Sequence, residues 1–188
     1  MKSYIISAWL VLLSTTAYLQ KVNCADTPLM SAVKKDDVDL VKRLLANGAD
    51  AKETNLGGWS ALMFAAAYGD DKTVKLLIPK SDVKATNEVG RSALMFAASS
   101  GNDKLVRLLL PNSNVKASDQ NGETALMIAT RYGDIKLVKL LLPNSDVTAT
   151  NKQGQNALDL AKYRGLDSEF IKKSNVKRQQ EYEILILF

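Results

Sequence analysis

Three polar residues that recur at equal spacing are the first candidates for chemistry in this sequence. Asp70, Asn102 and Asp134 lie 32 residues apart, a spacing that could suggest a ladder of metal-binding side chains. A cation such as Ca²⁺ takes roughly six to eight oxygen ligands, and one side chain in each such interval is too sparse to supply them. Capping of a following helix explains these residues better, so the sequence predicts no metal site.

Catalytic groups are equally sparse. The 188 residues include no His and a single Cys, Cys24. This composition excludes Ser-His-Asp, Cys-His and His-ligated zinc chemistry, as well as an intramolecular disulfide and a Cys-built zinc site. Glu88, Asp119 and Glu123 could be posed as an acid–base pair, but we expect them on turn tips where nothing encloses or desolvates them. The sequence therefore predicts neither an enzyme nor a cofactor.

A 32-residue period organises most of the chain. A glycine two residues earlier precedes each of several similar runs, such as Ser60-Ala-Leu-Met-Phe-Ala-Ala and Ser92-Ala-Leu-Met-Phe-Ala-Ala. An earlier copy starts at Thr27, so the sequence contains five copies. The glycines and prolines that recur at this spacing are Gly58, Gly90, Gly122 and Gly154, then Gly69, Gly101, Gly133 and Gly165, then Pro79, Pro111 and Pro143.

Each copy has the pattern of a helical hairpin. Ser60 and its equivalents are N-cap types, and the Leu, Met and Ala after them predict a short first helix that Gly69 ends in a left-handed conformation. Apolar residues at i, i+3 and i+4 indicate a second helix around residues 71–78, with Pro79 just past its last turn. Asn, Asp, Ser and Thr are frequent in the return segments, which we expect to be exposed turns: 82–89, 114–121 and 146–153.

The first copy carries motifs specific to a known family. Thr27-Pro-Leu-Met-Ser-Ala and Leu44-Leu-Ala-Asn-Gly-Ala-Asp50 resemble the ankyrin repeat, which consists of a β-turn and two helices. The resemblance covers residues 26–173 and implies an all-α, ankyrin-type solenoid of stacked helix-turn-helix repeats with β-turn fingers, in copies at about 26–57, 58–89, 90–121, 122–153 and 154–173. Where the family usually has His, we expect Met side chains to act as flexible apolar plugs. The residues at that position are Met30, Met63, Met95, Met127 and Asp159.

Residues 1–25 have a different character. Lys2 precedes a mostly apolar run over residues 5–13, and small and polar residues follow, which is the pattern of a secretory signal peptide. Cleavage could follow Ala17, Cys24 or Ala25; an uncleaved anchor and a buried N-terminal helix are the alternatives. We therefore expect a secreted or periplasmic protein, without a membrane span after cleavage and monomeric.

The charge of the remaining chain argues against a nucleic-acid partner. Removing residues 1–25 would delete Lys2 and Lys21 and no acid, so the formal net charge would fall from +5 to +3. That charge is modest and interleaved, without a block of Lys and Arg.

The resemblance implies a binding scaffold, because such arrays mostly bind other proteins through their turn tips and the exposed side of their first helices. A structural or protective accessory of an envelope or secreted enzyme, and a secreted host-directed effector, are the alternatives. Carried over copy by copy, the resemblance predicts a concave face with these partner-binding residues: Leu56, Trp59, Tyr68, Glu88, Arg91, Ser99, Gln120, Glu123, Arg131, Tyr132, Tyr163 and Arg164.

Aromatic and Arg side chains among these residues are the types enriched at interface hot spots. For Tyr68, Tyr132 and Tyr163 the alternative is that the rings pack between neighbouring first helices with their hydroxyls in water. Trp59 lies beside Gly57 on an expected turn tip, where a structural role is less obvious, so we expect it to contact the partner.

The C-terminal tail, residues 174–188, ends in Ile184-Leu-Ile-Leu-Phe188. This apolar end is far too short to cross a membrane. It could dock on the last copy, pair as an edge strand, or be captured by a partner.

Overall fold

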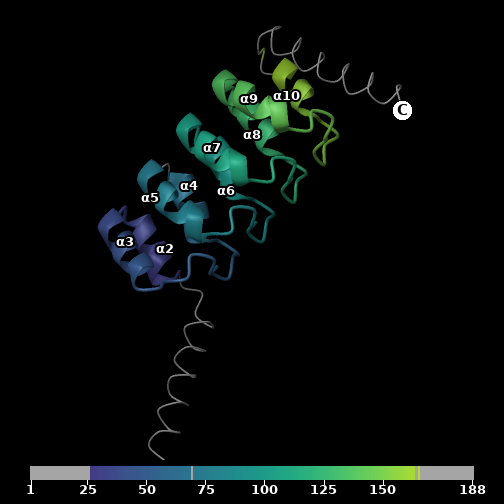
Figure 1. Cartoon of the computed structure of the whole chain (residues 1–188). Coiled ribbons are helices and arrows are strands. Elements are labelled where there is room, and N and C mark those ends of the chain that lie inside the picture. Colours follow the sequence, from purple (N-terminus) through teal and green to yellow (C-terminus); the bar gives the residue numbers. More distant parts are fainter. Residues whose placement is uncertain (1–25, 69, 164, 166–188) are drawn as a thin grey trace, which may run out of the picture.

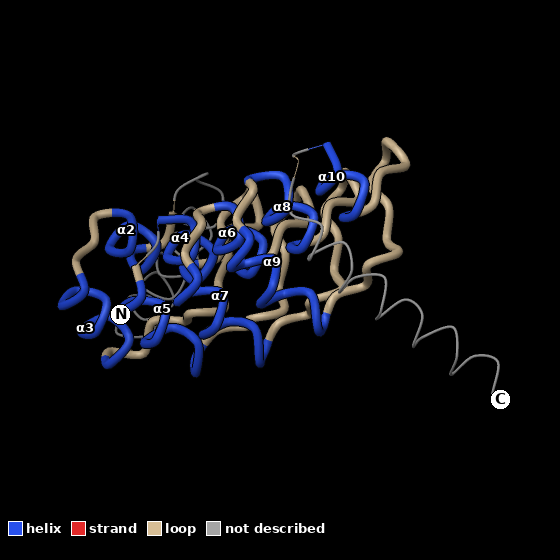
Figure 2. The backbone as a smooth tube through the Cα atoms, turned by 90° about the horizontal axis from the view of Figure 1, so that it is seen from above, coloured by secondary structure: helices blue, strands red, loops and turns tan. Residues whose placement is uncertain are grey.

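The computed structural model describes residues 26–68, 70–163 and 165. The predicted signal peptide (1–25), Gly69, Arg164 and the C-terminal tail (174–188) lie outside the described residues. In the described part the chain forms α-helices, short 3-10 turns and loops, with isolated bridges but no strand (Figure 2). The all-α class is therefore confirmed.

The helices form two parallel rows along the array (Figure 1). Each of the first four helices of the inner row packs against the next inner helix and against the outer helix that follows it in the chain. The inner helices are α2 (Pro28–Lys34), α4 (Ala61–Tyr68), α6 (Ala93–Ser99), α8 (Ala125–Tyr132) and α10 (Ala157–Tyr163). The outer helices are α3 (Val38–Ala46), α5 (Asp71–Leu77), α7 (Asp103–Leu109) and α9 (Ile135–Leu141). Among the described residues no helix is long and apolar enough to cross a bilayer.

Side-chain caps start these short helices as predicted. The Thr124 hydroxyl accepts a hydrogen bond from the Met127 amide at 3.3 Å, and Gly133 ends α8 with a φ of +78°. The recurring polar residues also act as caps, because the Asp70 carboxylate accepts from the Lys72 amide at 3.0 Å and Asn102 and Asp134 cap the next two outer helices. Helix capping thus accounts for the spacing that first suggested metal ligands.

The α-helices of the outer row end just before the prolines, as predicted. The sequence did not predict that Pro79, Pro111 and Pro143 each lie inside a 3-10 turn that follows the α-helix. A proline at the first or second position of such a turn removes no needed hydrogen bond, since that N–H has no partner there. The 3-10 turns cover Ile78–Lys80, Leu110–Asn112 and Leu142–Asn144.

The methionines fill the core at the base of the first helices. Met30, Met63, Met95 and Met127 are at most 1% exposed, which confirms the expected plug. In the first copy the sulfur of Met30 also accepts a hydrogen bond from the Thr27 amide at 3.4 Å, so it completes a capping box as well as filling space. In the last copy Asp159 accepts from the Asn156 amide at 3.1 Å in the same way.

The segments that return the chain between copies are not simply exposed turns. They extend into projecting fingers, residues 52–60, 84–92, 116–124 and 148–156, and parts of the fingers are buried, including Asn151 at 4% and Asn87 at 6% exposure. Successive fingers are linked by backbone hydrogen bonds, among them Gln120 N–H to the Val89 carbonyl at 2.9 Å. Many residues of these segments are exposed as expected, but the expectation fails for Asn87, Asp119 and Asn151, which are buried where successive fingers pack together.

Glycine makes this close approach possible. At Gly122, which has a φ of +75°, a Cβ would lie 2.9 Å from the Asn151 Cα of the next finger. Gly58 and Gly90 face the following finger in the same way. Gly154 has a similar φ of +73°, but a Cβ there would meet nothing within 4 Å.

Alanine substitutions at Gly122 and Gly154 should separate backbone strain from finger contact. We expect Gly154→Ala to lower the free energy of unfolding by about 1 kcal/mol, the cost of a left-handed non-glycine residue. Gly122→Ala should lower it by about 2–4 kcal/mol, because the methyl group also overpacks the next finger. Urea unfolding followed by circular dichroism measures both, and equal losses would contradict the finger contact.

Candidate functional site

One side chain closes each finger. The Oδ1 atom of Asp119 accepts hydrogen bonds from the amides of Asn121 and Glu123 at 2.8 and 3.0 Å. The equivalent Asn55 and Asn151 accept from the residues two and four positions ahead in the same way, and Asn87 from the residue four ahead. These hydrogen bonds hold in place the residue four positions after the Asn or Asp. We call this place in each finger the finger-end position. It is occupied by Trp59, Arg91, Glu123 and Gln155.

Trp59 has a structural role that was not obvious from the sequence, and its contact with a partner stays a prediction. Its ring stacks on Phe64 of its own copy, with centroids 4.8 Å apart, and on Phe96 of the next copy at 4.3 Å. Offset stacking of this kind adds about 0.5–1.5 kcal/mol to the area that the rings bury. The ring is half-buried, and its remaining surface stays accessible to a partner.

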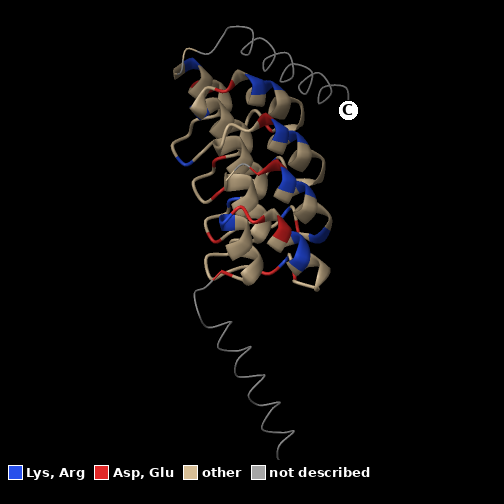
Figure 3. Ribbon diagram, turned by 90° about the vertical axis from the view of Figure 1, so that its left-hand side faces the viewer, with Lys and Arg blue, Asp and Glu red and all other residues tan. Residues whose placement is uncertain are grey.

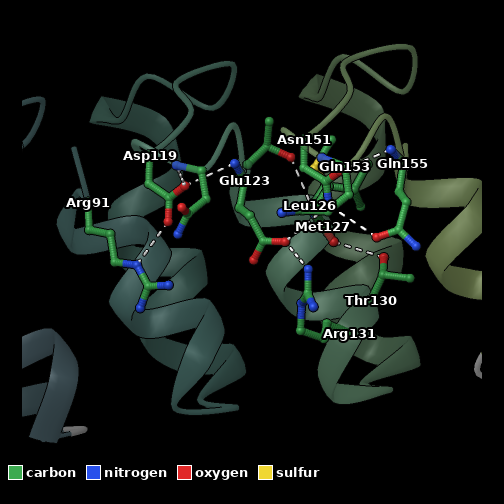
Figure 4. Close-up of polar contacts among 12 residues, drawn as sticks. Arg91, Asp119, Glu123, Leu126, Met127, Thr130, Arg131, Asn151, Gln153 and Gln155 are labelled. Atoms are coloured by element: carbon green, nitrogen blue, oxygen red, sulfur yellow. Dashed lines mark hydrogen bonds and ion pairs between the residues drawn. The ribbon is translucent and has the colours of Figure 1, made fainter. Parts of the chain in front are cut away.

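Charged pairs follow at the next two finger ends (Figure 4). Arg91 donates from Nε to the Asp119 carboxylate at 3.1 Å, and that side chain is only 2% exposed. Arg131 forms an ion pair with Glu123, which also accepts a hydrogen bond from Asn151 at 3.4 Å. Each finger end therefore bridges to the next copy or to the inner helix beside it.

Two of the three carboxylates expected on open turn tips are buried. Asp119 is 7% and Glu123 is 8% exposed, whereas Glu88 is exposed. The exposure assumed for Glu123 is wrong, because the turn closed by Asp119 points its side chain at Arg131. A contact between Glu123 and a partner stays a prediction.

Three tyrosines on the inner helices are largely in solvent. Tyr68, Tyr132 and Tyr163 are 62%, 61% and 88% exposed. Tyr68 lies beside Phe64 with ring centroids 6.3 Å apart, and the Tyr132 hydroxyl accepts a hydrogen bond from Ser99 at 3.4 Å. Each of these two contacts leaves most of the Tyr side chain accessible.

We call the surface made by the finger ends and the exposed side of the inner helices the inner face. Its N-terminal half is mainly aromatic, and its C-terminal half combines exposed Tyr132 and Tyr163 with charged and amide side chains. All predicted partner-binding residues except Arg164 lie on the fingers or inner helices that form it. Sequence reasoning missed Phe64, Phe96 and Leu160, which occupy one position of the 32-residue period and lie beneath the finger ends.

Lys and Arg residues instead follow the outer helices from one end of the array to the other (Figure 3). Acidic and basic residues alternate along the sequence, but the fold gathers the basic ones on the outer helices because the repeat places them at the same helical positions. The exposed members include Lys72, Lys75, Lys104, Arg107, Lys136 and Lys139. The described residues contain no group of three or more Asp, Glu, Cys or His that could hold a metal ion.

Asp26 ties the first copy to the first finger. Its carboxylate accepts a hydrogen bond from Asn55 at 2.8 Å and pairs with Lys34. Burial alone would raise the pKa of Asp26, but the hydrogen bonds from Lys34 and Asn55 and the Lys34 charge outweigh it and lower the pKa below the usual value.

Stacked helical hairpins with projecting fingers define the class of protein as a helical-repeat solenoid. The chain belongs to the ankyrin repeat family. The family model described as "Ankyrin repeats (3 copies)" matches four overlapping stretches of the chain, residues 9–87, 29–119, 62–151 and 94–172. The chain is also similar to the mitochondrial disaggregase of Bos taurus, with 38% identity over 60 residues. That match covers 32% of this chain and only 9% of the disaggregase.

Two substitutions at Asp119 should separate turn closure from ion pairing. Asp119→Asn keeps an acceptor for the finger amides, as in the fingers that have Asn, and loses only the pair with half-exposed Arg91, so we expect a loss of about 0.5–1 kcal/mol. Asp119→Ala leaves both amides without an acceptor and should cost about 2–4 kcal/mol. Chemical unfolding measures both, and similar losses would show that the ion pair dominates.

The lowered pKa of Asp26 predicts a pH-dependent contribution to stability. A depressed pKa means that the stabilisation is complete above the unfolded-state value and is lost as the pH falls through the folded-state value. The unfolding midpoints of the chain and of Asp26→Asn should therefore differ at pH 6 and converge as the pH falls below about 3.8. Urea titrations at several pH values measure the difference, and a gap that stays constant would contradict the assignment.

Proposed function

We propose that this protein is a non-catalytic scaffold that binds another protein through its inner face. The observation that carries the proposal is the exposure of Tyr68 and Tyr132 on a surface whose fingers are tied together. Tyrosine presents a large contact area at a low entropic cost, and a preorganised surface loses little further entropy on binding. Ankyrin repeats are generally protein–protein interaction modules, which supports the same function.

The two halves of the inner face favour a partner with two kinds of surface. Trp59 and Tyr68, with exposed Leu56 beside them, would bury apolar area against the partner. Arg91 and Arg131 already pair with buried carboxylates, so they would contribute directed hydrogen bonds more than net charge. An apolar or aromatic element of the partner is therefore expected near the N-terminal half, and an element with both aromatic and polar groups near the C-terminal half.

We also propose that the protein acts outside the cytoplasm as a secreted or periplasmic monomer. The basic start, the apolar run over residues 5–13 and the small residues after it support this compartment. A structural accessory of an envelope or secreted enzyme is one form that the scaffold function could take.

Substitutions on opposite faces test the binding surface. Affinity capture from the native compartment with mass spectrometry would identify the partner and its stoichiometry. We expect the double variant Tyr68→Ser/Tyr132→Ser to bind that partner at least about tenfold more weakly, because two exposed aromatic contacts are lost. The control Lys75→Ser/Arg107→Ser changes exposed residues of the outer helices and should bind normally. If both double variants lose affinity for the partner equally, or if neither loses affinity, the inner face is not the binding site.

N-terminal sequencing of the exported protein tests the compartment. A product that begins after Ala17, Cys24 or Ala25 is expected. A product that retains Met1, or a protein found only in the cytoplasm, would overturn this part of the proposal.

A further inference from the structure

We propose that a groove between the fourth and fifth copies binds the end of this same chain, residues 184–188, as an extended segment. This inference goes beyond the partner proposed above and does not depend on it.

The groove consists of two adjoining hollows on the inner face. The larger has a volume of about 400 Å³ and the smaller about 210 Å³, and they share Arg131 and Gln155 in their walls. Asn121, Glu123 and Gln153 complete the larger hollow. Leu160 and Tyr163 complete the smaller one.

The groove is open here because of two residue changes in the fifth copy. In the fourth copy, Glu123 and Arg131 form an ion pair across the inner face. The fifth copy has Gln155 and Tyr163 at the same two positions of the repeat. These side chains carry no charges to pair, and Tyr163 is 88% exposed, so no described residue closes the space above Leu160.

The lining of the larger hollow is suited to an uncharged peptide backbone. Among the described residues that line it, the charged ones are Glu123 and Arg131, which pair with each other, so their formal charges cancel. Carboxamides of Asn121, Gln153 and Gln155 line the rest, and each offers both a donor and an acceptor, as a peptide group does. The side-chain oxygen of Gln155 accepts a hydrogen bond from the Asn151 side chain. The side-chain nitrogen of Gln155 lies on the other side of the amide group (Figure 4).

The smaller hollow is suited to one apolar side chain. Small-molecule sites usually exceed roughly 300 Å³, so this hollow of about 210 Å³ is too small for a complete ligand of that kind. Leu160, the ring of Tyr163 and the methylene groups of Arg131 and Gln155 offer apolar surface on its sides. A backbone that follows the larger hollow could place one aliphatic or aromatic side chain here.

The end of the chain has the matching composition and is within reach. Residues 184–188 are Ile, Leu, Ile, Leu and Phe, with no charge, and the charged residues of the tail precede them. Twenty residues, 164–183, separate Tyr163 from Ile184, and a chain of that length spans at most about 70 Å, so residues 184–188 can reach the groove. Such a tether gives an effective concentration of about millimolar, so even a weak contact would be occupied. Left in water, this end would be an exposed apolar patch.

Photo-crosslinking in the whole chain tests the occupant. With p-benzoylphenylalanine in place of Tyr163, irradiation at low micromolar concentration should give a crosslink within one chain that maps to residues 184–188. The tail variant Leu185→Asp/Leu187→Asp should lower its yield at least about tenfold, because burial of even one Leu is worth about a factor of ten in affinity. The control Lys177→Asp changes a charged residue of the same tail and should leave the yield unchanged.

Three results would overturn the proposal. The first is a crosslink between chains whose yield rises with concentration, which would assign the groove to a second copy. The second is a crosslink only to a co-purified protein, and the third is no crosslink to residues 184–188. As a check that leaves Tyr163 in place, removal of residues 184–188 should shift the NMR signal of the Gln155 side-chain amide, and an unchanged signal would also refute the docking. Failure here leaves the Tyr68/Tyr132 test of partner binding unaffected.

Discussion

Backbone contact between successive fingers is the constraint on which the rest of this structure depends. At Gly58, Gly90 and Gly122 the chain passes so close to the next finger that a side chain would collide with its backbone. The same approach lets one finger donate a backbone hydrogen bond to the preceding one, as Lys152 does to Asn121 at 2.8 Å. The fingers are thereby held at a fixed spacing, and the inner helices behind them are stacked in the same register.

The finger-end position shows why variation within a repeat does not by itself indicate a binding site. Its four residues are a tryptophan, an arginine, a glutamate and a glutamine, yet each is engaged within the array. Trp59 stacks on the next copy, Arg91 and Glu123 form ion pairs, and Gln155 accepts a hydrogen bond from Asn151. Each copy thus uses a different chemistry at this position for contacts that hold the array together. The exposed tyrosines lie one or two turns away and remain accessible to a partner.

Local features were predictable from the sequence because they depend on residues close to one another. The caps at Thr124 and Asp70, the left-handed Gly133 and the buried methionines follow from patterns within one turn or one helix. The stacking of Trp59 on Phe96 and the burial of Asp119 depend on residues of the neighbouring copy, so they require the stacking register, which a single repeat does not specify. The 3-10 turns at the prolines were missed for a different reason, since proline ends an α-helix but fits the start of a tighter turn. For the candidate site, the sequence placed these residues on fingers and inner helices, where the structure has them, but it did not give their mutual pairing. That they bind a partner stays a prediction.

Native-state hydrogen exchange tests the central claim, the continuous contact between fingers, most directly. The amides of Glu88, Gln120 and Lys152 donate the bonds between fingers at 3.0, 2.9 and 2.8 Å. If the fingers form one connected ladder, these three amides should exchange at least about a hundredfold more slowly than in an unstructured peptide, and with similar opening free energies. Exchange of all three at the unprotected rate, while the inner helices stay protected, would contradict the account.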